Sequence, residues 1–555
     1  MSAAARWTLA ERGAELALAE GERLDLVVVG GGITGAGVLR DAASRGLRAL
    51  LVERGDFASG TSGRSSKLVH GGLRYLGAGQ LAVVRSSCRE RDRLLAQNPH
   101  LLSPVEFLLP AYADSRLPPW KLRGALFTYA LLSGFRRSAR GRMLGAAEAR
   151  ARLPALRGEG LLGAGLYRDA RVDDARLVLE TLKSARSLGG TALSHTEVVE
   201  FLREGERVRG VRVRDALSGR RVEIRAHCVV NAAGPAVERV RGLDAPVPRP
   251  ELRPAKGIHL VVPRRRVPTD LAVTSEADDG RHLFLVPWED MALIGTSDSF
   301  TDEIDEPVVT IEEVHYLLTW ANRVFPQAGL TTNDLCSVFA GVRPLAADAG
   351  ALGPPSSVSR EERLYRDRSG LLSIAGGKLT THRAIGERIV DRVLRLLPEE
   401  RRAAAGPSRT AQLPLRADDF DRAELEAELA RRFGVAPWRA AHLVSSYGAA
   451  SRELLAEAPP ELRAPIGDSR FTLAEIPWCF ATECPASLAD VLERRVRMAL
   501  WASGQGVPEL PQVARIAAEA AGWDAERARA EAAGYTASLR RRYQIVAPSS
   551  QRSAA

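Results

Sequence analysis

Apolar runs and glycine-rich breaks alternate most regularly between residues 24 and 76. The apolar run at residues 26–29 has the length of a buried strand, and glycines and then a helical pattern follow it at once. A second apolar run, Ala49–Val52, has the same character and leads into Glu53. The pattern predicts a strand, a tight turn, a helix and a second strand that ends at an acidic residue.

The glycines of the predicted turn, Gly30, Gly32 and Gly35, have the GxGxxG spacing. The first allows the sharp turn, the second lets a pyrophosphate approach the backbone, and the third lets helix and strand pack closely. The helix N-terminus offers free N–H groups to phosphates, and Glu53 lies roughly 20 residues on, where a carboxylate bonds ribose hydroxyls. We predict a dinucleotide site; the alternative is a glycine turn in an ordinary βαβ unit.

The segment after the second strand indicates which dinucleotide is bound. A nicotinamide domain usually continues with further βα units, whereas residues 56–76 are polar, glycine-rich and basic. This composition suits a loop that wraps a pyrophosphate and runs beneath a flavin ring. The cofactor-binding candidates in it are Thr61, Ser62, Ser65, Ser66, Lys67, His70, Gly71 and Gly72.

Later segments of the chain add further strands and helices to this predicted dinucleotide-binding unit. Residues 171–190 predict a helix, and alternation from residue 196 predicts a β-meander that leads to a buried strand at residues 228–230. A further strand at residues 373–374 precedes a glycine turn and a helix. The cofactor-binding candidates here are Val198, Gly234 and Gly377.

These patterns predict an α/β protein with a Rossmann-like FAD-binding domain, a mixed-sheet substrate domain and a C-terminal helical domain. A helical lead-in at residues 1–23 offers Trp7, Leu9, Leu16 and Leu18 as docking positions. We interpret the helical domain as serving packing or partner contact. The expected limits are 1–105, 166–250 and 336–402 for the FAD-binding domain, 106–165 and 251–335 for the substrate domain, 403–545 for the helical domain and 546–555 for a disordered tail.

The chain has 555 residues and a formal net charge of +10, from 78 basic and 68 acidic residues. Acids and bases are interspersed, and nearly all the bases are arginine. We therefore favour a general arginine bias and expect no nucleic-acid partner; attraction to anionic substrates or lipid head groups is the functional alternative. Of the five lysines, Lys67, Lys256 and Lys378 lie in glycine-bearing segments, which hints at a need for a compact ammonium group there.

The cysteines give no sign of a metal centre. They lack the paired spacing of a zinc site, so we expect core thiols in a reducing cytoplasm and no metal. The N-terminus lacks a secretory apolar region, and no apolar stretch reaches about 18 residues, so we expect no membrane-spanning helix. The cysteines are Cys88, Cys228, Cys336, Cys479 and Cys484.

Taken in order, the motifs resemble those of the flavin-dependent glycerol-3-phosphate dehydrogenase family, within the D-amino-acid-oxidase-like flavoproteins. The resemblance covers nearly the whole chain, and the ordered set makes it specific. The set is GGGITGAGVLRDAASRGL, VERGDFASGTSGRSSKLVHGGLRYL, RVDDARLV, NAAGP, KGIHLVVP, FLVPWED with IGTSDS, AGVRPL, GGKLTTHR and LADVLERRVRMAL.

The resemblance implies a non-covalent FAD, sn-glycerol 3-phosphate as substrate, dihydroxyacetone phosphate as product and a membrane quinone as electron acceptor. It implies a cytoplasmic enzyme that is peripheral on the inner face of the cell membrane, and a homodimer is compatible with it. The alternatives are a glycerol-3-phosphate oxidase that uses oxygen, an amine or amino-acid oxidase of the same fold, and a non-catalytic flavin sensor.

A phosphate monoester needs convergent cations, because it carries close to two negative charges. The substrate-binding candidates are Arg74, Arg343, Lys378 and Thr380, and matching family positions line the substrate pocket. For Arg343, which lies between a glycine-bearing stretch and a proline, the alternative is a buried salt bridge. For Lys378 the alternative is a cation on the first turn of a helix, where it opposes the helix dipole.

Oxidation of an alcohol also needs a base for the hydroxyl proton. His259 follows Ile258 in a strand pattern and is our candidate, because histidine titrates in the useful range. The alternative is a core or surface histidine without a catalytic role. His70 competes for the role, although its place before Gly71 suggests flavin positioning, and Asp298 suits a turn.

Residues 116–142 form a candidate membrane contact. An apolar stretch with Trp120, Phe127, Tyr129 and Phe135 is surrounded by arginines and a lysine, and it is too short to span a bilayer but long enough to lie in its interface. The alternative is a core-facing helix flanked by solvated charges.

Overall fold

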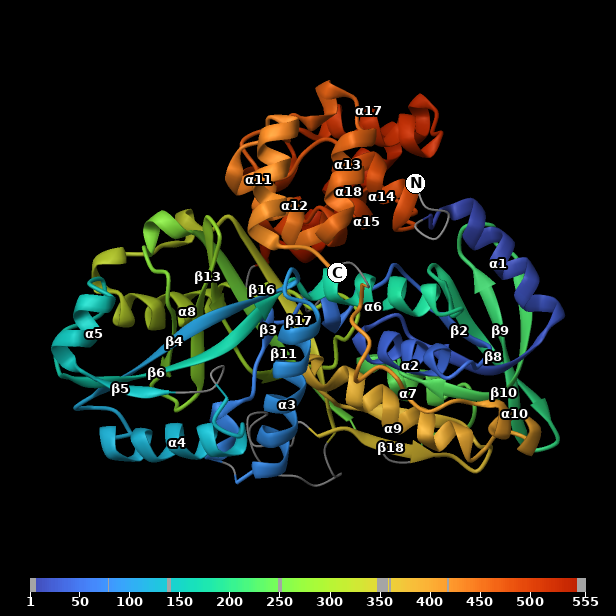
Figure 1. Cartoon of the computed structure of the whole chain (residues 1–555), viewed down its shortest axis with the longest axis horizontal. Coiled ribbons are helices and arrows are strands. Elements are labelled where there is room, and N and C mark those ends of the chain that lie inside the picture. The colour runs from blue at the N-terminus through green and yellow to red at the C-terminus, as the bar shows by residue number, and fades with distance from the viewer. Residues whose placement is uncertain are drawn as a thin grey trace, which may run out of the picture.

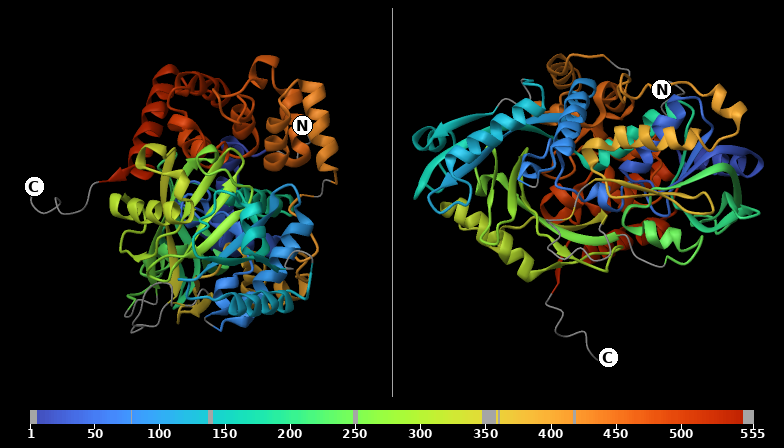
Figure 2. Two further views of the ribbon diagram at one scale, coloured as in Figure 1. Left: turned by 90° about the vertical axis from the view of Figure 1, so that its left-hand side faces the viewer. Right: turned by 90° about the horizontal axis from the view of Figure 1, so that it is seen from below.

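The computed structural model describes residues 6–77, 79–136, 141–247, 252–346, 358, 361–416 and 419–546. Two mixed sheets lie side by side, and the C-terminal helices, in orange and red, form a layer above both (Figure 1). The left view of Figure 2 shows the same separation of the helical layer from the sheets. Among the described residues, no helix is long and apolar enough to cross a membrane.

The first sheet has the strand order β18-β19-β10-β1-β2-β7, and β9 and β8 extend it from β10 as an antiparallel meander. Strands β10, β1, β2 and β7 are parallel neighbours. The strands are β1 (Arg23–Val29), β2 (Ala49–Val52), β7 (Thr191–Leu193), β8 (Thr196–Glu204), β9 (Arg207–Asp215), β10 (Arg221–Asn231), β18 (Arg363–Arg366) and β19 (Leu372–Ala375).

Both faces of this sheet are covered, which explains why its central strands read as continuous apolar runs. Leu26 and Val28 of β1 pack in one core with side chains of α2, α6 and α9. Val27 and Val29 pack in another with the meander and with Leu16 of α1. The helices are α1 (Leu9–Gly21), α2 (Ile33–Ser44), α6 (Asp174–Ser187), α7 (Val237–Arg241), α9 (His382–Leu394) and α10 (Glu399–Ala404).

The second sheet has the order β15-β11-β14-β13-β12-β4-β6-β3, with β17 paired to β11 and β5 to β6. The strands are β3 (Leu68–Val69), β4 (Leu102–Tyr112), β5 (Arg142–Gly145), β6 (Leu161–Val172), β11 (Leu252–Pro263), β12 (Ala272–Glu276), β13 (His282–Trp288), β14 (Met291–Gly295), β15 (Ser299–Phe300) and β17 (Ser337–Ala346). The helices around it are α3 (Leu81–Gln97), α4 (Pro119–Leu132), α5 (Ala146–Arg152) and α8 (Ile311–Val324).

The C-terminal layer is helical and is tied to the rest of the chain. A short parallel pair joins Val309 of β16 to Ile545 of β20, so the end of the layer returns to the second sheet's side. Its elements are α11 (Arg422–Phe433), α12 (Pro437–Tyr447), α13 (Ser451–Glu457), α14 (Glu475–Thr482), α15 (Leu488–Asp490), a π-helical turn (Val491–Arg495), α16 (Met498–Trp501), α17 (Leu510–Ala521), α18 (Ala525–Arg542) and β20 (Ile545–Val546); β16 is Val309–Thr310.

The fold class expected from the sequence is confirmed. The lead-in helix docks through Trp7 and Leu16, which are buried, but the prediction for Leu18 is wrong, because its side chain is 70% exposed. Strand β17 lies in the stretch assigned to the FAD-binding domain but pairs in the second sheet. The tail expected at 546–555 lies outside the described residues except for Val546, which is in β20.

Candidate active site

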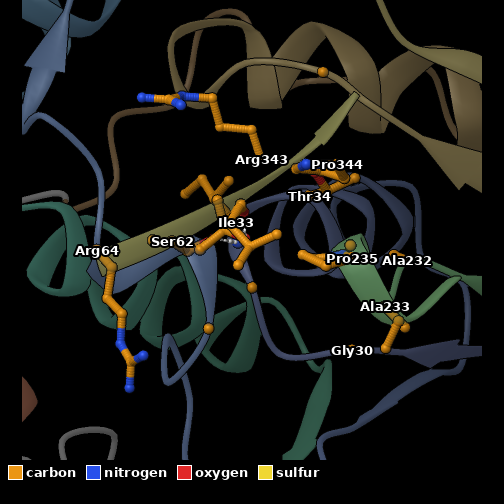
Figure 3. Close-up of a pocket in the computed structure, with 18 of the residues that line it drawn as sticks. Gly30, Ile33, Thr34, Ser62, Arg64, Ala232, Ala233, Pro235, Arg343 and Pro344 are labelled. Atoms are coloured by element: carbon orange, nitrogen blue, oxygen red, sulfur yellow. Dashed lines mark hydrogen bonds between the residues drawn. The ribbon is translucent and has the colours of Figure 1, made fainter. Parts of the chain in front are cut away.

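A cavity of about 420 Å³ opens where the two sheets meet. The first sheet contributes the carboxyl ends of β1, β2, β10 and β19, and the second sheet contributes His259 of β11 and Arg343 of β17. In open α/β sheets, ligands bind outside the carboxyl ends of the strands, so this is the place expected for a nucleotide. Figure 3 shows Gly30 beside Ala233 on one side of the cavity and Arg343 on the other.

The glycine turn after β1 has the close contacts that a dinucleotide cradle requires. Gly30 has φ +114°, and a Cβ there would lie 2.6 Å from the carbonyl oxygen of Ala232. A Cβ on Gly35 would lie 1.9 Å from the carbonyl oxygen of Gly30, so helix and strand pack as closely as the motif predicts. The N–H of Ile33 in the first turn of α2 donates to Ser62 Oγ at 2.9 Å (Figure 3).

The carboxylate of Glu53 lines the cavity at the end of β2. One oxygen accepts the N–H of Gly31 at 2.6 Å, and the other accepts the N–H of Gly55 at 2.9 Å. Both bonds fix the carboxylate next to the glycine turn. The tight glycines, the helix N-terminus and this acidic group fit the diphosphate and ribose of a dinucleotide.

Arg343 is held among polar groups of the second sheet. Its Nη1 donates to Asp298 Oδ1 at 2.9 Å, and its Nη2 donates to Thr296 Oγ1 at 2.7 Å. A Cβ on Gly257 would lie 2.2 Å from Arg343 Nη2, so the glycine before Ile258 makes room for the guanidinium group. Arg343 therefore forms a partly buried ion pair and also lines the cavity, so its role in substrate binding stays a prediction.

Two further cations lie close to the ring of Tyr75. The Lys378 Nζ is 3.8 Å from the centre of the Tyr75 ring, and the Arg74 guanidinium carbon is 5.0 Å from it. Arg74 Nη2 also donates to the Tyr75 hydroxyl at 3.1 Å. The His70 N–H donates to Thr380 Oγ1 at 3.2 Å, which joins the loop carrying Arg74 to the turn carrying Lys378.

His259 is 3% exposed, and its ring stacks on Phe339 with centroids 4.9 Å apart. Its Nε2 is 2.8 Å from Ser66 Oγ, and its Nδ1 is buried without a hydrogen-bond partner among the described residues. Burial, and then the positive charge of Arg343, hold the pKa of His259 well below its usual value of 6.5. The ring is thus neutral at neutral pH and has the lone pair that a proton acceptor needs.

Most of the residues proposed from the sequence gather around this cavity, and four do not line it. Lys67 is fully buried, and its Nζ pairs with Asp174 at 2.8 Å; burial, then the nearby Arg497, lower its pKa to about 8. Gly35 and Gly71 also do not line this cavity, and Gly72 lines a neighbouring one. The predicted residues that do line the cavity are His259, Arg343, Arg74, Lys378, Thr380, Gly30, Gly32, Glu53, Thr61, Ser62, Ser65, Ser66, His70, Val198, Gly234 and Gly377.

The structure adds groups that the sequence interpretation passed over. Tyr75 lies close to two cations, and Thr296 and Gly257 shape the surroundings of Arg343. Asp298, interpreted as a turn residue, pairs with Arg343. Gly257 and Tyr75 lie in or beside the segments GIH and GLR, and Thr296 and Asp298 lie in IGTSDS. These short segments were the only available signal, because the contacts of Arg343 join strands that are far apart in the sequence.

The fold and the site define a dinucleotide-dependent oxidoreductase, and comparison with known proteins agrees. The family model described as FAD dependent oxidoreductase matches residues 25–392. The model described as C-terminal domain of alpha-glycerophosphate oxidase matches residues 408–528.

Individual relatives show which members of this broad family the chain is similar to in sequence and structure. The aerobic glycerol-3-phosphate dehydrogenase of Staphylococcus aureus (strain USA300) is 39% identical over 443 residues, which are 78% of this chain and 79% of the relative. The solved structure of the glycerol-3-phosphate dehydrogenase from Bacillus halodurans complexed with FAD is 31% identical, with a TM-score of 0.79, and the match covers 96% of this chain and 98% of that one. The L-alpha-glycerophosphate oxidase from Mycoplasma pneumoniae with FAD bound is 18% identical with a TM-score of 0.53 over 67% of this chain and 95% of its own, and it shows the fold alone.

The chain belongs to the FAD-dependent glycerol-3-phosphate dehydrogenase family, as its motifs predicted, and its cofactor is FAD.

Proposed function

We propose that this protein oxidises sn-glycerol 3-phosphate to dihydroxyacetone phosphate and passes the electrons through FAD to a membrane quinone. The observation that supports the reaction best is the cavity wall that combines Arg74, Arg343 and Lys378 with the neutral His259. A doubly charged phosphate needs such convergent cations, and an alcohol needs the adjacent base.

In this proposal the cations bind the phosphate and so orient the carbinol carbon. Arg343 is preorganised for this task, because Thr296 and Asp298 already fix its guanidinium plane. Lys378 and Arg74, which lie beside Tyr75, add further positive charge to the cavity wall. The arrangement favours a substrate with two negative charges over glycerol itself.

His259 accepts the hydroxyl proton in this proposal. A bound phosphate dianion offsets the positive charge of Arg343 that depresses its pKa, so substrate binding makes the ring a stronger base. Ser66 fixes the ring through Nε2, which leaves Nδ1 as the nitrogen without a partner among the described residues. FAD supplies the acceptor for the hydride when it is bound.

A second cavity, also of about 420 Å³, supports a quinone as electron acceptor. It shares the lining residues Leu68, His70 and Arg74 with the substrate cavity, so the two cavities are neighbours. Its remaining wall is mainly apolar, which suits a quinone ring and isoprenoid chain better than a small polar oxidant. Apolar residues of this wall include Leu76, Leu109, Leu117, Leu122 and Phe284.

Helix α4 forms part of that second cavity and carries an exposed apolar stripe. Trp120, Phe127 and Leu131 are 71%, 62% and 53% exposed, while Leu122 and Tyr129 on the other side of the helix are buried. Exposed Lys121 and Arg123 accompany the stripe. Aromatic and aliphatic side chains flanked by cations are typical of a helix that lies in an anionic membrane interface, so we place this face against the membrane. Residues 137–140 of the predicted segment lie outside the described residues.

The acceptor is tested with enzyme that has been reduced by glycerol 3-phosphate without oxygen. We expect a short-chain quinone in vesicles to reoxidise it much faster than dissolved oxygen, with little peroxide formed. Leu81→Glu places a charge in the second cavity and should slow reoxidation by quinone without slowing reduction. Leu162→Glu, at a similarly exposed leucine outside both cavities, is the matched control. Fast reaction with oxygen and stoichiometric peroxide would instead establish the oxidase.

A further inference from the structure

Three arginines of the C-terminal layer, Arg494, Arg495 and Arg497, are buried against the loop that follows β2. Arg495 binds the carboxylate of Asp56 through both terminal nitrogens, at 2.7 and 3.0 Å, and Arg494 binds the same carboxylate. The side chains of Arg494, Arg495 and Arg497 are 7%, 0% and 3% exposed. A carboxylate–guanidinium contact of this kind is costly to bury and is sensitive to loss of one partner.

Arg497 contacts both the loop after β2 and the start of α6. Its Nη2 donates to the carbonyl oxygen of Gly63 at 2.8 Å, and its Nη1 donates to Asp174 at 2.6 Å and to Asp173 at 2.8 Å. Its backbone has φ +56°, in the left-handed region that non-glycine residues seldom adopt. A strained residue that is held by its side-chain contacts is a common sign of a functional position.

Asp174, which binds Arg497, also contacts residues 61–67 directly. It accepts the N–H of Ser65 at 2.9 Å and the Ser65 hydroxyl at 2.8 Å, and it pairs with Lys67. The other side of the same loop faces the cavity, where Ser62 binds the first turn of α2 and Ser66 binds His259. Residues 61–67 thus contact Arg497 of the C-terminal layer on one side. On the side that faces the cavity they contact the cofactor cradle and the candidate base His259.

We propose that Arg497 is a positioning residue for FAD and for His259. It fixes residues 61–67 through Gly63 and Asp174, and in this way the C-terminal domain takes part in holding the cofactor. The inference rests on the proposed FAD site. Removal of Arg497 leaves the Lys67–Asp174 pair intact, so the variant should fold with a looser loop rather than with an unpaired buried charge.

A metal centre is the rival explanation for part of this cluster. Ligand atoms of Asp56, His195 and Asp490 lie within 4.8 Å of one another. However, Arg494 pairs with both Asp56 and Asp490, and Arg495 pairs with Asp56 as well. Arginine charge already balances the carboxylates, so the cluster is better explained as a connection between domains.

The test measures FAD release from the full-length holoenzyme, followed as flavin fluorescence after dilution. Arg497→Ala should release FAD roughly 10- to 100-fold faster, since hydrogen bonds to charged groups are lost. Added guanidinium should slow the release again, and Arg497→Lys should lie in between. Arg470→Ala is the matched control, because Arg470 is a buried arginine of the C-terminal layer that pairs with Glu289 and Asp290 in the turn between β13 and β14.

Release from Arg497→Ala as slow as from the wild type would overturn the inference. So would an equal acceleration in Arg470→Ala, or no response to guanidinium, because either result would indicate general loosening of the domain. If Arg497→Ala does not fold, Arg497→Lys decides: an unchanged release rate rejects the inference. Wild-type protein that binds no FAD would refute the proposed site itself.

Discussion

At the scale of single residues, the candidate site consists of charged groups whose positions neighbouring groups already fix. Arg343 is oriented by Thr296 and Asp298 and has room because residue 257 is glycine. His259 is oriented by Ser66 and kept neutral by burial and by Arg343. Preorganisation of this kind lowers the cost of binding a small, highly charged substrate.

Arg343→Met should lower kcat/KM for glycerol 3-phosphate by roughly 10- to 100-fold, because a charged hydrogen-bonding partner of the phosphate is lost. The weak activity on glycerol, which has no phosphate, should change little. Steady-state kinetics on the two substrates measures the difference. An equal loss on both substrates would argue that Arg343 only supports the fold.

The titration of His259 can be followed directly. Because burial and Arg343 lower its pKa well below 6.5, the ring should stay neutral at pH 6.5 and take up a proton only in more acidic solution. Ring-nitrogen NMR of substrate-free enzyme, with the signal assigned by its loss in His259→Gln, measures this. His259→Gln should also slow turnover by about 100-fold or more. A midpoint at or above pH 6.5 would contradict the environment described for the ring.

The sequence predicted single site residues correctly where a short local motif fixes their positions. Gly30, Gly32 and Glu53 line the cavity because turn, helix N-terminus and strand end are set within one short unit. The prediction failed for Lys67, which was selected as part of the polar, glycine-rich loop and, additionally, because lysine is scarce in this chain; Lys67 is buried and pairs with Asp174. Its partner Asp174 lies on a distant helix, and nothing local to Lys67 in the sequence indicates that pairing.

At the scale of elements, the close packing of α2 on β1 determines the shape of the cofactor cradle. The buried strands were readable from the sequence because both faces of β1 and β2 are covered, which produces unbroken apolar runs. The sequence did not predict that β17 belongs to the second sheet. Its partner β11 precedes it by a long stretch of chain, and the apolar pattern of a buried strand does not specify its neighbour.

Gly35→Ala tests the packing of α2 on β1. The new methyl group would lie 1.9 Å from the carbonyl oxygen of Gly30, so helix and strand must separate. We expect a loss of stability of about 1–3 kcal/mol or more and weaker FAD binding. Gly13→Ala in α1, where a Cβ meets nothing within 4 Å, is the control and should be neutral or slightly stabilising. Equal thermal stability of the two variants would refute the packing argument.

The exposed stripe of α4 gives a prediction about membrane binding. Phe127→Gln combined with Leu131→Gln should weaken sedimentation with anionic vesicles, because two exposed apolar contacts with the bilayer are removed. Thermal stability should hardly change, since neither side chain is buried. Leu18→Gln alters a leucine that is 70% exposed on α1 and should leave vesicle binding intact. Equal binding by all variants would contradict the assignment of this face.

At the scale of the whole molecule, the substrate cavity lies between two sheets and the helical layer supports one of its loops. The first sheet supplies the cofactor cradle, and the second supplies His259 and Arg343. The sequence predicted the FAD-binding, substrate and helical parts, because apolar residues recur at different intervals in strands and in helices. The contact of Arg497 with Gly63 could not be predicted, because it joins segments that are brought together only by the complete fold.

The central claim is that one cavity holds FAD beside a phosphate-specific alcohol site. The most direct measurement is the absorbance of the flavin after glycerol 3-phosphate is added to purified holoenzyme without oxygen. We predict rapid bleaching that glycerol and D-amino acids do not cause and that Arg343→Met slows strongly. A bound flavin that stays oxidised with glycerol 3-phosphate, or that bleaches with an amino acid instead, would contradict the account.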